Sequence, residues 1–278
     1  MNIESINKIK KSFIFRLINL SLLVVSLKYL YDYYQNLDLF RLYSYDFFIL
    51  IPIALLVFGN IINAFAWSSF IGDKDINFQQ INLWMISSIG KYLPFKIGIP
   101  SLRTSLNLNV SKHKSKNILK KIFFEQIIII IFTLFFGLLY FLKNQISLSV
   151  FYILFLILFL LIIFKNKYFP KIYIVIYGFG QWFIVFGLIQ FSQLNYVNLN
   201  HEIIFGYLLT STASMVALNI PAGIGFREAL TLLFFEGIFS SELIYIFVIN
   251  IRALLVVVDL IIFIIGILTK YIYQIVYN

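Results

Sequence analysis

The sequence predicts an all-α polytopic membrane protein with about six transmembrane helices and two oppositely oriented re-entrant helical hairpins. Of its 278 residues, 61% are hydrophobic and only 12% are charged, which excludes an ordinary soluble domain. Several apolar runs approach or exceed the roughly 20 residues that a helix needs to cross a bilayer. No polar region is long enough for a second domain, so residues 1–278 are predicted to form a single transmembrane domain.

Six apolar segments are long enough to be full spans. They are 13–33, 47–70, 122–142, 148–164, 172–191 and 243–268. The first follows a basic flank, KIKK, and lacks a small-residue cleavage pattern, so it is predicted to be retained rather than removed as a signal peptide.

Two further apolar segments are interrupted and do not fit a plain span. In segment 81–100, the apolar part before Pro94 is too short to cross, and segment 203–239 is broken by NIPAGIGFRE. A broken full span is the alternative for the second segment. Irregular backbone at membrane depth requires protein or water to satisfy its hydrogen bonds, so two re-entrant hairpins imply an interior cavity.

The distribution of lysine and arginine predicts that both termini are cytoplasmic. With the N-terminus inside, the cytoplasmic side collects most of the 22 basic residues, including the cation-rich connection from Lys74 to Lys121. This asymmetry accounts for most of the net charge of +10, so nucleic-acid binding is not indicated. In this topology, segment 81–100 begins and ends on the cytoplasmic side, and segment 203–239 begins and ends on the outer side.

The two interruptions resemble each other. The first reads PFKIG (94–98) and the second PAGIG (221–225), and each precedes an arginine, Arg103 or Arg227. We interpret them as an inverted repeat; two ordinary proline and glycine breaks at helix ends are the alternative. The predicted hairpin backbone residues are Pro94, Gly98, Pro221, Gly223 and Gly225. Glycine there permits positive φ and close approach by a ligand, although a packing role is equally compatible.

Charged residues inside apolar segments are the main candidates for function. An arginine at the centre of a membrane helix costs about 2.5 to 3.5 kcal/mol on insertion scales, so such groups usually face the bundle interior and pair or bind a ligand. Arg227 follows the second break, at the expected start of a half-helix, where an anion is favoured. Pairing with Glu228 is the alternative for Arg227. Arg252 and Asp259 lie near one helix face, with Glu125 as a candidate partner from another span.

A family resemblance rests on three motifs. The chain resembles the transmembrane-region family of lysylphosphatidylglycerol synthases, also called flippase-like membrane proteins, over roughly residues 60–270. The matching residues are Lys91, Tyr92, Leu93, Pro94, Arg103, Glu125, Pro221, Gly223, Gly225, Arg227, Glu228 and Arg252. Phe95 departs from the pattern, because a glycine usually follows the first proline.

The resemblance implies a role in moving or handling anionic lipids or lipid-linked glycans. The predicted lipid-binding or anion-binding residues are Lys91, Arg103, Arg227 and Arg252, and the predicted charge partners are Glu125, Glu228 and Asp259. The larger synthases carry a soluble aminoacyl-transferase domain after this unit. This chain ends directly after its last predicted span, so synthase activity is not expected.

The sequence contains no enzyme signature, and we predict no catalytic residue, no cofactor and no metal site. The predicted function is a flippase-like lipid translocase in the cell membrane, with an anionic phospholipid or a polyprenyl-linked glycan precursor as its substrate. The first alternative is a non-catalytic membrane partner of a glycosyltransferase in cell-envelope glycan synthesis. The second is a secondary transporter of a small anion. In the run STASMV, Ser211 and Ser214 either line a polar path or permit close helix packing.

Overall fold

The described part of the chain is helical almost throughout. The computed structural model describes residues 47–71, 77–92, 98–108, 115–138, 153, 157, 172–195, 202–216 and 226–277. No strand occurs within these ranges. The predicted span 13–33 lies outside the described residues, as does 148–164 apart from residues 153 and 157.

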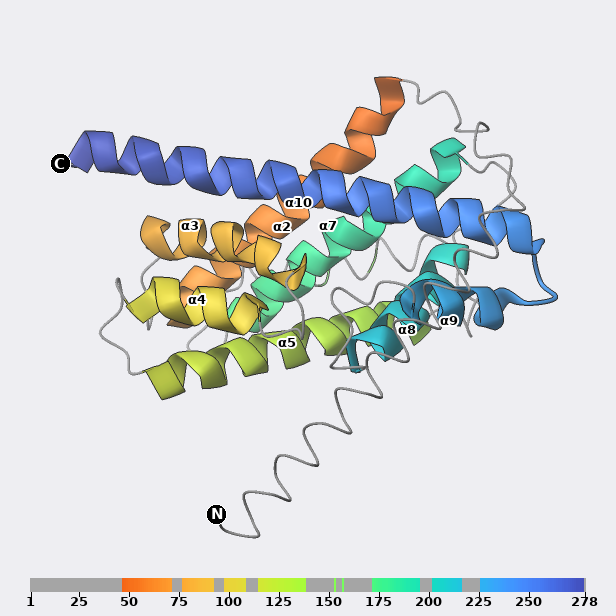
Figure 1. Cartoon of the computed structure of the whole chain (residues 1–278), viewed down its shortest axis with the longest axis horizontal. Helices are drawn as coiled ribbons and strands as arrows, with labels where there is room; N and C mark the ends of the chain where they lie inside the picture. Colours follow the sequence, from red (N-terminus) through yellow and green to blue (C-terminus); the bar gives the residue numbers. More distant parts are fainter. Residues whose placement is uncertain are drawn as a thin grey trace, which may run out of the picture.

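Four long apolar helices form the frame (Figure 1). They are α2 (Leu50–Ile71, preceded by the short 3-10 helix η1, Phe47–Ile49), α5 (Ser115–Leu138), α7 (Ile172–Asn195) and α10 (Ser241–Tyr277). All four are long and apolar enough to cross a membrane. They correspond to four of the six predicted spans.

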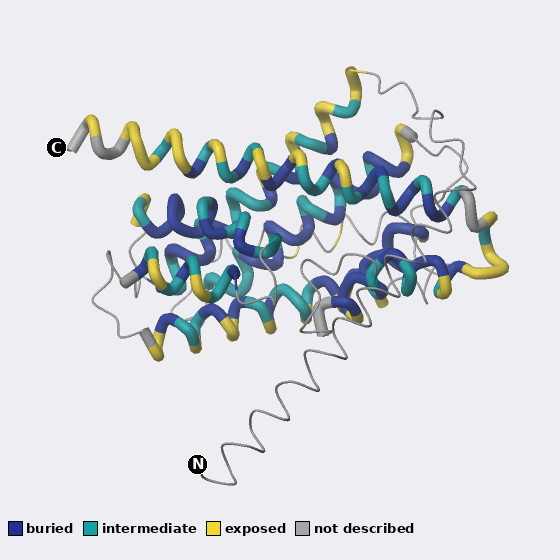
Figure 2. Tube along the Cα trace, in the orientation of Figure 1, coloured by how far each residue is buried: buried dark blue, intermediate teal, exposed yellow. Residues whose placement is uncertain are grey.

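The exposed faces of these helices are apolar. On α5, for example, Phe123, Ile127, Ile131, Leu134 and Leu138 are all exposed and recur every three or four residues. Figure 2 shows exposed positions along the outer side of α10 as well. A continuous apolar stripe facing outward suits contact with lipid chains rather than water. The length, composition and surface of these four helices are therefore those expected of a multi-pass membrane protein.

Two pairs of shorter helices flank the two sequence breaks. The first pair is α3 (Phe78–Ser87, continued by the 3-10 helix η2, Ser88–Tyr92) and α4 (Gly98–Leu108). The second is α8 (Glu202–Val216) and α9 (Phe226–Phe235). At 1.5 Å per residue, the ten residues of α3 or α9 extend about 15 Å, half of a typical hydrocarbon core. The breaks at 93–97 and 217–225, which include Pro94, Pro221, Gly223 and Gly225, lie outside the described residues.

The two pairs lie toward opposite ends of the bundle. Figure 1 shows α3 along the C-terminal half of α10, with α4 packed on α3, and α9 toward the N-terminal half of α10, with α8 packed on α9. The helix α10 packs against α3 and α9, and α5 packs against α4 and α8, so each of these two long helices contacts both pairs.

Helix boundaries differ from the prediction where charged residues begin a helix. The helix α5 starts at Ser115 rather than 122, so Lys121 lies inside it. The Lys121 ammonium donates hydrogen bonds to the carbonyl oxygens of Phe70 and Ile71, at 3.0 and 3.3 Å. These are terminal carbonyls of α2, which lack partners within that helix. The lysine thus stabilises the end of one span from the start of another.

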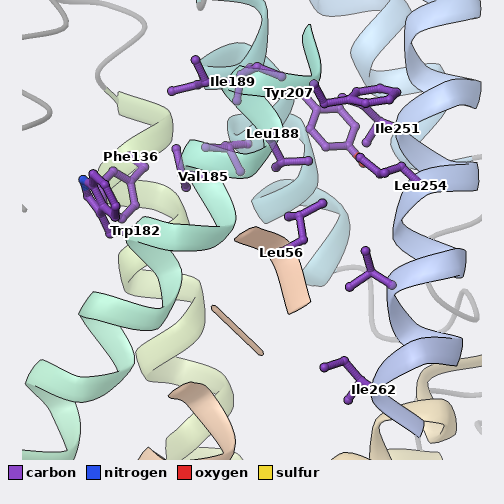
Figure 3. Close-up of a cluster of buried hydrophobic side chains, with 14 of the residues drawn as sticks. Leu56, Phe136, Trp182, Val185, Leu188, Ile189, Tyr207, Ile251, Leu254 and Ile262 are labelled. Atoms are coloured by element: carbon purple, nitrogen blue, oxygen red, sulfur yellow. The ribbon is translucent and has the colours of Figure 1, made fainter. Parts of the chain in front are cut away.

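The core centres on the contact between α2 and α7. A Cβ atom built on Gly59 would lie 2.7 Å from the carbonyl oxygen of Gly180, and one on Gly180 would lie 2.3 Å from Asn63 Oδ1. Small residues at membrane helix interfaces allow such close backbone approach. Around this contact, Leu56, Val185 and Leu188 belong to the buried cluster in Figure 3.

A second close glycine contact joins η2 to the start of α4. A Cβ atom on Gly90 would lie 2.7 Å from the carbonyl carbon of Gly98 and 2.7 Å from the nitrogen of Ile99. Both are backbone atoms, so they cannot move aside as a side chain can. Gly98, predicted as a hairpin glycine, is therefore buried against Gly90 at the start of α4.

We expect Gly90→Ala to destabilise the packing of η2 on α4, because the added methyl group would force their backbones apart. Overpacking of this kind costs about 1 to 3 kcal/mol. The melting temperature of the purified protein in detergent would report the loss. Ser105→Ala, at an exposed position on α4, is the control and should leave that temperature unchanged. Equal melting temperatures for the two variants would contradict the close contact.

Candidate functional site

Charged and polar side chains of the described helices gather in two clusters. The Arg103 cluster comprises Trp67, Trp84, Ser87, Arg103 and Glu125. The central cluster comprises Lys91, Tyr92, Tyr207, Ser211, Ser214, Arg227, Glu228, Arg252 and Asp259.

The Arg103 cluster is built around a fully buried ion pair. Arg103 on α4 pairs with Glu125 on α5, and their side chains are 2% and 0% exposed. Glu125 also accepts a hydrogen bond of 2.5 Å from the Trp84 indole, and Arg103 Nε donates one of 2.9 Å to Ser87 Oγ. The pair therefore connects α3, α4 and α5.

Two tryptophans complete this cluster. The guanidinium carbon of Arg103 lies 4.8 Å from the ring centre of Trp67 on α2 and 5.3 Å from that of Trp84 on α3. Cation–π contacts in a desolvated site contribute roughly 2 kcal/mol. Arg103 thereby fastens four helices, which is a positioning role for a residue that the sequence had suggested as a lipid ligand.

Glu125 has a different partner from the one suggested by the sequence. Sequence reasoning placed it as a candidate partner of Arg252, whereas its cation in the structure is Arg103. The physical reason is topological, because α4 and α5 are consecutive helices that pack together, and Arg252 instead faces α9.

Several buried polar atoms near this pair have no hydrogen-bond partner among the described residues. They are Asn63 Oδ1, Trp67 Nε1, Gln80 Oε1, Thr104 Oγ1 and Asn107 Oδ1. Asn63 and Gln80 each lie one helical turn before a tryptophan of the Arg103 cluster, and Thr104 follows Arg103. Buried polar atoms of this kind are usually satisfied by ordered water.

On one side of the central cluster, η2 meets α10. Lys91 Nζ lies 2.5 Å from Asp259 Oδ2, and the Tyr92 hydroxyl donates a hydrogen bond of 2.5 Å to the same oxygen. Tyr92 and Lys91 thus bring two donors from η2 to one buried carboxylate of α10.

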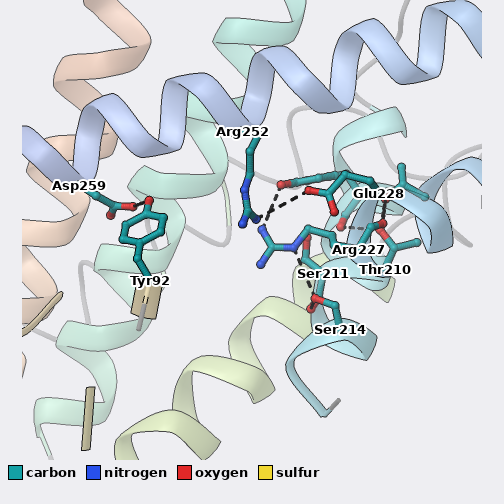
Figure 4. Close-up of polar contacts among 10 residues, drawn as sticks. Tyr92, Thr210, Ser211, Ser214, Arg227, Glu228, Arg252 and Asp259 are labelled. Atoms are coloured by element: carbon teal, nitrogen blue, oxygen red, sulfur yellow. Dashed lines mark hydrogen bonds and ion pairs between the residues drawn. The ribbon is translucent and has the colours of Figure 1, made fainter. Parts of the chain in front are cut away.

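On the other side, α8 and α9 meet α10. Arg252 Nη1 lies 3.8 Å from Glu228 Oε1, and the Arg227 guanidinium donates hydrogen bonds to the Tyr207 hydroxyl at 3.2 Å and to Ser214 Oγ at 3.4 Å. Figure 4 shows these side chains converging from the three helices. Glu228, suggested as the partner of Arg227, thus also lies near a second cation, Arg252 of α10.

The two sides are close enough to interact electrostatically. The charges of Arg252 and Arg227 both act on the Tyr92 hydroxyl. Residues from η2, from the pair α8 and α9, and from α10 therefore form one cluster. It contains three cations, Lys91, Arg227 and Arg252, and two carboxylates, Glu228 and Asp259, so its formal charge is +1 when all five are ionised.

The cluster is only partly closed. Glu228 and Asp259 have side chains that are 8% exposed, whereas Arg252 is 20% and Lys91 37% exposed. Its carboxylates are thus buried, while two of its cations retain access to the exterior. That arrangement can receive an anion, and the anion would offset the surplus positive charge.

Sequence reasoning named Tyr92, Ser211 and Ser214 but missed the other neutral members of the two clusters, which are Tyr207, Trp67, Trp84 and Ser87. Tyr207 is one of 18 tyrosines and Trp67 one of three tryptophans in an aromatic-rich chain, so their residue type carried little signal. The helical spacing of Tyr207, Ser211 and Ser214 on α8 could have indicated one polar face.

No group of three or more histidine, cysteine, aspartate or glutamate side chains suited to a metal ion occurs in the described ranges. No protein-family model, curated protein or solved structure matches the chain.

Proposed function

We propose that the protein is a flippase-like lipid translocase that moves an anionic phospholipid or a lipid-linked glycan precursor across a cell membrane. The observation that carries this proposal is the central cluster, where three cations outnumber two carboxylates inside an apolar helical bundle. Charged groups placed at such cost usually serve a substrate path or a binding site.

The positions of the short helices support the same proposal. The pairs α3/α4 and α8/α9 lie toward opposite ends of α10 and meet at the central cluster, as two inverted re-entrant hairpins would (Figures 1 and 4). In this proposal six spans surround them, both termini are cytoplasmic, and the two hairpins open the cluster to alternate sides.

Arg227 is the proposed headgroup ligand. It is the second residue of α9, where backbone N–H groups and the helix dipole favour an anion, and its guanidinium can bind a phosphate with two hydrogen bonds. Arg252 and Lys91 add positive charge nearby. Arg103 lies outside this site, because Glu125 and two indole rings already surround it.

We expect Arg227→Ala to reduce transport of fluorescent phosphatidylglycerol in proteoliposomes by about tenfold or more, since hydrogen bonds to charged groups contribute about 1.5 to 3 kcal/mol. A dithionite quenching assay measures the flipped fraction. Lys120→Ala, which removes an exposed cation from α5, is the control and should transport normally. Undiminished transport by Arg227→Ala would show that Arg227 is not the headgroup ligand.

The same preparation separates the alternatives. A glycosyltransferase that co-purifies with a chain inactive in liposomes would indicate an accessory role. Uptake of a radiolabelled soluble anion, independent of lipid composition, would indicate a secondary transporter. Single cysteines near positions 94 and 221 should react with an impermeant maleimide from opposite sides; labelling from one side would contradict the inverted hairpins.

A further inference from the structure

We propose that the central cluster recognises a phosphate headgroup that also carries a neutral hydroxyl group, and that Glu228 Oε2 and Ser211 Oγ accept its hydrogen bonds. This inference rests on the proposed function and specifies the substrate class of the same site. A polyol phosphate such as phosphoglycerol, or a sugar phosphate, has this chemistry.

The first observation is a pair of buried acceptors without donors. Glu228 is 6% exposed and Ser211 is 4% exposed, yet Glu228 Oε2 and Ser211 Oγ have no hydrogen-bond partner among the described residues. A carboxylate oxygen left without a donor in such a place carries a desolvation cost of about 1 to 3 kcal/mol or more. A ligand that supplies a donor would recover that cost.

The second observation is the position of these acceptors beside Arg227. The charge of Glu228 acts directly on the Arg227 guanidinium. Ser211 lies one helical turn before Ser214, which accepts a hydrogen bond from Arg227 Nε. Figure 4 draws Glu228, Ser211 and Arg227 together. A single headgroup could therefore place its phosphate on Arg227 while its other end reaches the two acceptors.

The third observation distinguishes a neutral hydroxyl donor from a charged ammonium donor. Arg252 Nη1 lies 3.8 Å from the other oxygen of Glu228, so an ammonium group at Glu228 would also approach a guanidinium. Like charges at such distances repel strongly in a partly buried site. A neutral hydroxyl avoids this repulsion. The site therefore favours a hydroxyl-bearing anion over a headgroup that ends in an amine.

Three lipids that share acyl chains but differ in their headgroups test the proposal. Phosphatidylglycerol has a phosphodiester with free hydroxyls, phosphatidylethanol has the same charge without hydroxyls, and phosphatidylethanolamine ends in an ammonium. Binding would be measured in detergent, from the dependence of the melting temperature on lipid concentration, and transport would be measured in proteoliposomes.

For the wild-type protein, we expect phosphatidylglycerol to bind about tenfold more tightly than phosphatidylethanol, the fold-change that one hydrogen bond to a charged acceptor provides. Phosphatidylethanolamine should bind no better than phosphatidylethanol. Ser211→Ala should reduce the preference for phosphatidylglycerol over phosphatidylethanol, and Glu228→Gln should abolish that preference. Ser192→Ala, at a buried serine of α7 outside the cluster, should retain it. If Glu228→Gln fails to fold, the headgroup preference of Ser211→Ala still shows whether these acceptors bind the hydroxyl group.

Equal affinity of the wild type for phosphatidylglycerol and phosphatidylethanol, with both transported, would overturn this inference and leave the proposed function standing. Tighter binding of phosphatidylglycerol than of phosphatidylethanol, with neither lipid transported, would support this inference and overturn the proposed function. If phosphatidylethanolamine bound more tightly than phosphatidylglycerol, the claim that the site favours a neutral hydroxyl donor would be wrong. Import of radiolabelled glycerol phosphate without lipid transport would support the headgroup chemistry but assign it to a soluble ester.

Discussion

Replacement of Glu125 by alanine is expected to lower the stability of the protein by about 3 to 5 kcal/mol, the usual cost of leaving one member of a buried ion pair alone. Arg103 would keep its charge at a position where its side chain is 2% exposed. The same change would remove the acceptor of the Trp84 indole. The contacts among α3, α4 and α5 would therefore weaken together.

The measurement is the free energy of unfolding in mixed micelles, supported by size-exclusion profiles after heating. Glu236→Ala removes an exposed carboxylate between α9 and α10 and is the control, with a change of less than about 0.5 kcal/mol expected for such a surface site. A variant that replaces both Arg103 and Glu125 by methionine should be more stable than Glu125→Ala, because no unpaired charge remains. If the double variant were the less stable of the two, the cost would not come from the unpaired charge.

Introduction of leucine at Gly59 is the second change with a large expected effect. A Cβ atom there would lie 2.7 Å from the Gly180 carbonyl oxygen, 2.8 Å from Ile184 Cγ1 and 3.1 Å from the Ile184 nitrogen. Two of these atoms belong to the backbone of α7, so the helices must separate. The loss should reach or exceed the upper end of the roughly 1 to 3 kcal/mol that overpacking normally costs.

Melting temperature and the yield of monodisperse protein would report this effect. Ala54→Leu adds the same side chain to an exposed position of α2, five residues earlier, and should leave both quantities near wild type. Similar losses for the two variants would show that added bulk alone is harmful and that the contact with α7 is not the cause.

The sequence was sufficient for the features that depend on local composition. The four described spans follow from long apolar runs, but two ends do not: α5 begins at Ser115 rather than 122, and α10 ends at Tyr277 rather than 268. The helical segments on either side of each break followed from proline and glycine, which interrupt helices. Sequence reasoning placed Arg103 in a connection, whereas it lies within α4, because polar positions in a short amphipathic helix resemble a loop.

The pairing of charges could not be predicted, because it depends on which helices touch. Asp259 was grouped with Arg252 from their spacing on one helix, but its partners are Lys91 and Tyr92, contributed by η2. Glu228 was matched with its neighbour Arg227, and nothing in the sequence indicated that Arg252 of α10 also lies near it. Spacing along a chain identifies a shared helix face, but the partner across that face is determined by tertiary packing.

The glycine contact between α2 and α7 restricts where the bundle can move. With a backbone oxygen of one helix seated against the other at Gly59 and Gly180, neither helix can rotate or slide without a collision. These two helices should therefore travel as one rigid body during any opening and closing, and the hinge must lie where α3, α4, α8 and α9 border the rest. A cross-link between α2 and α7 would then leave turnover intact, whereas one between α9 and α10 would arrest it.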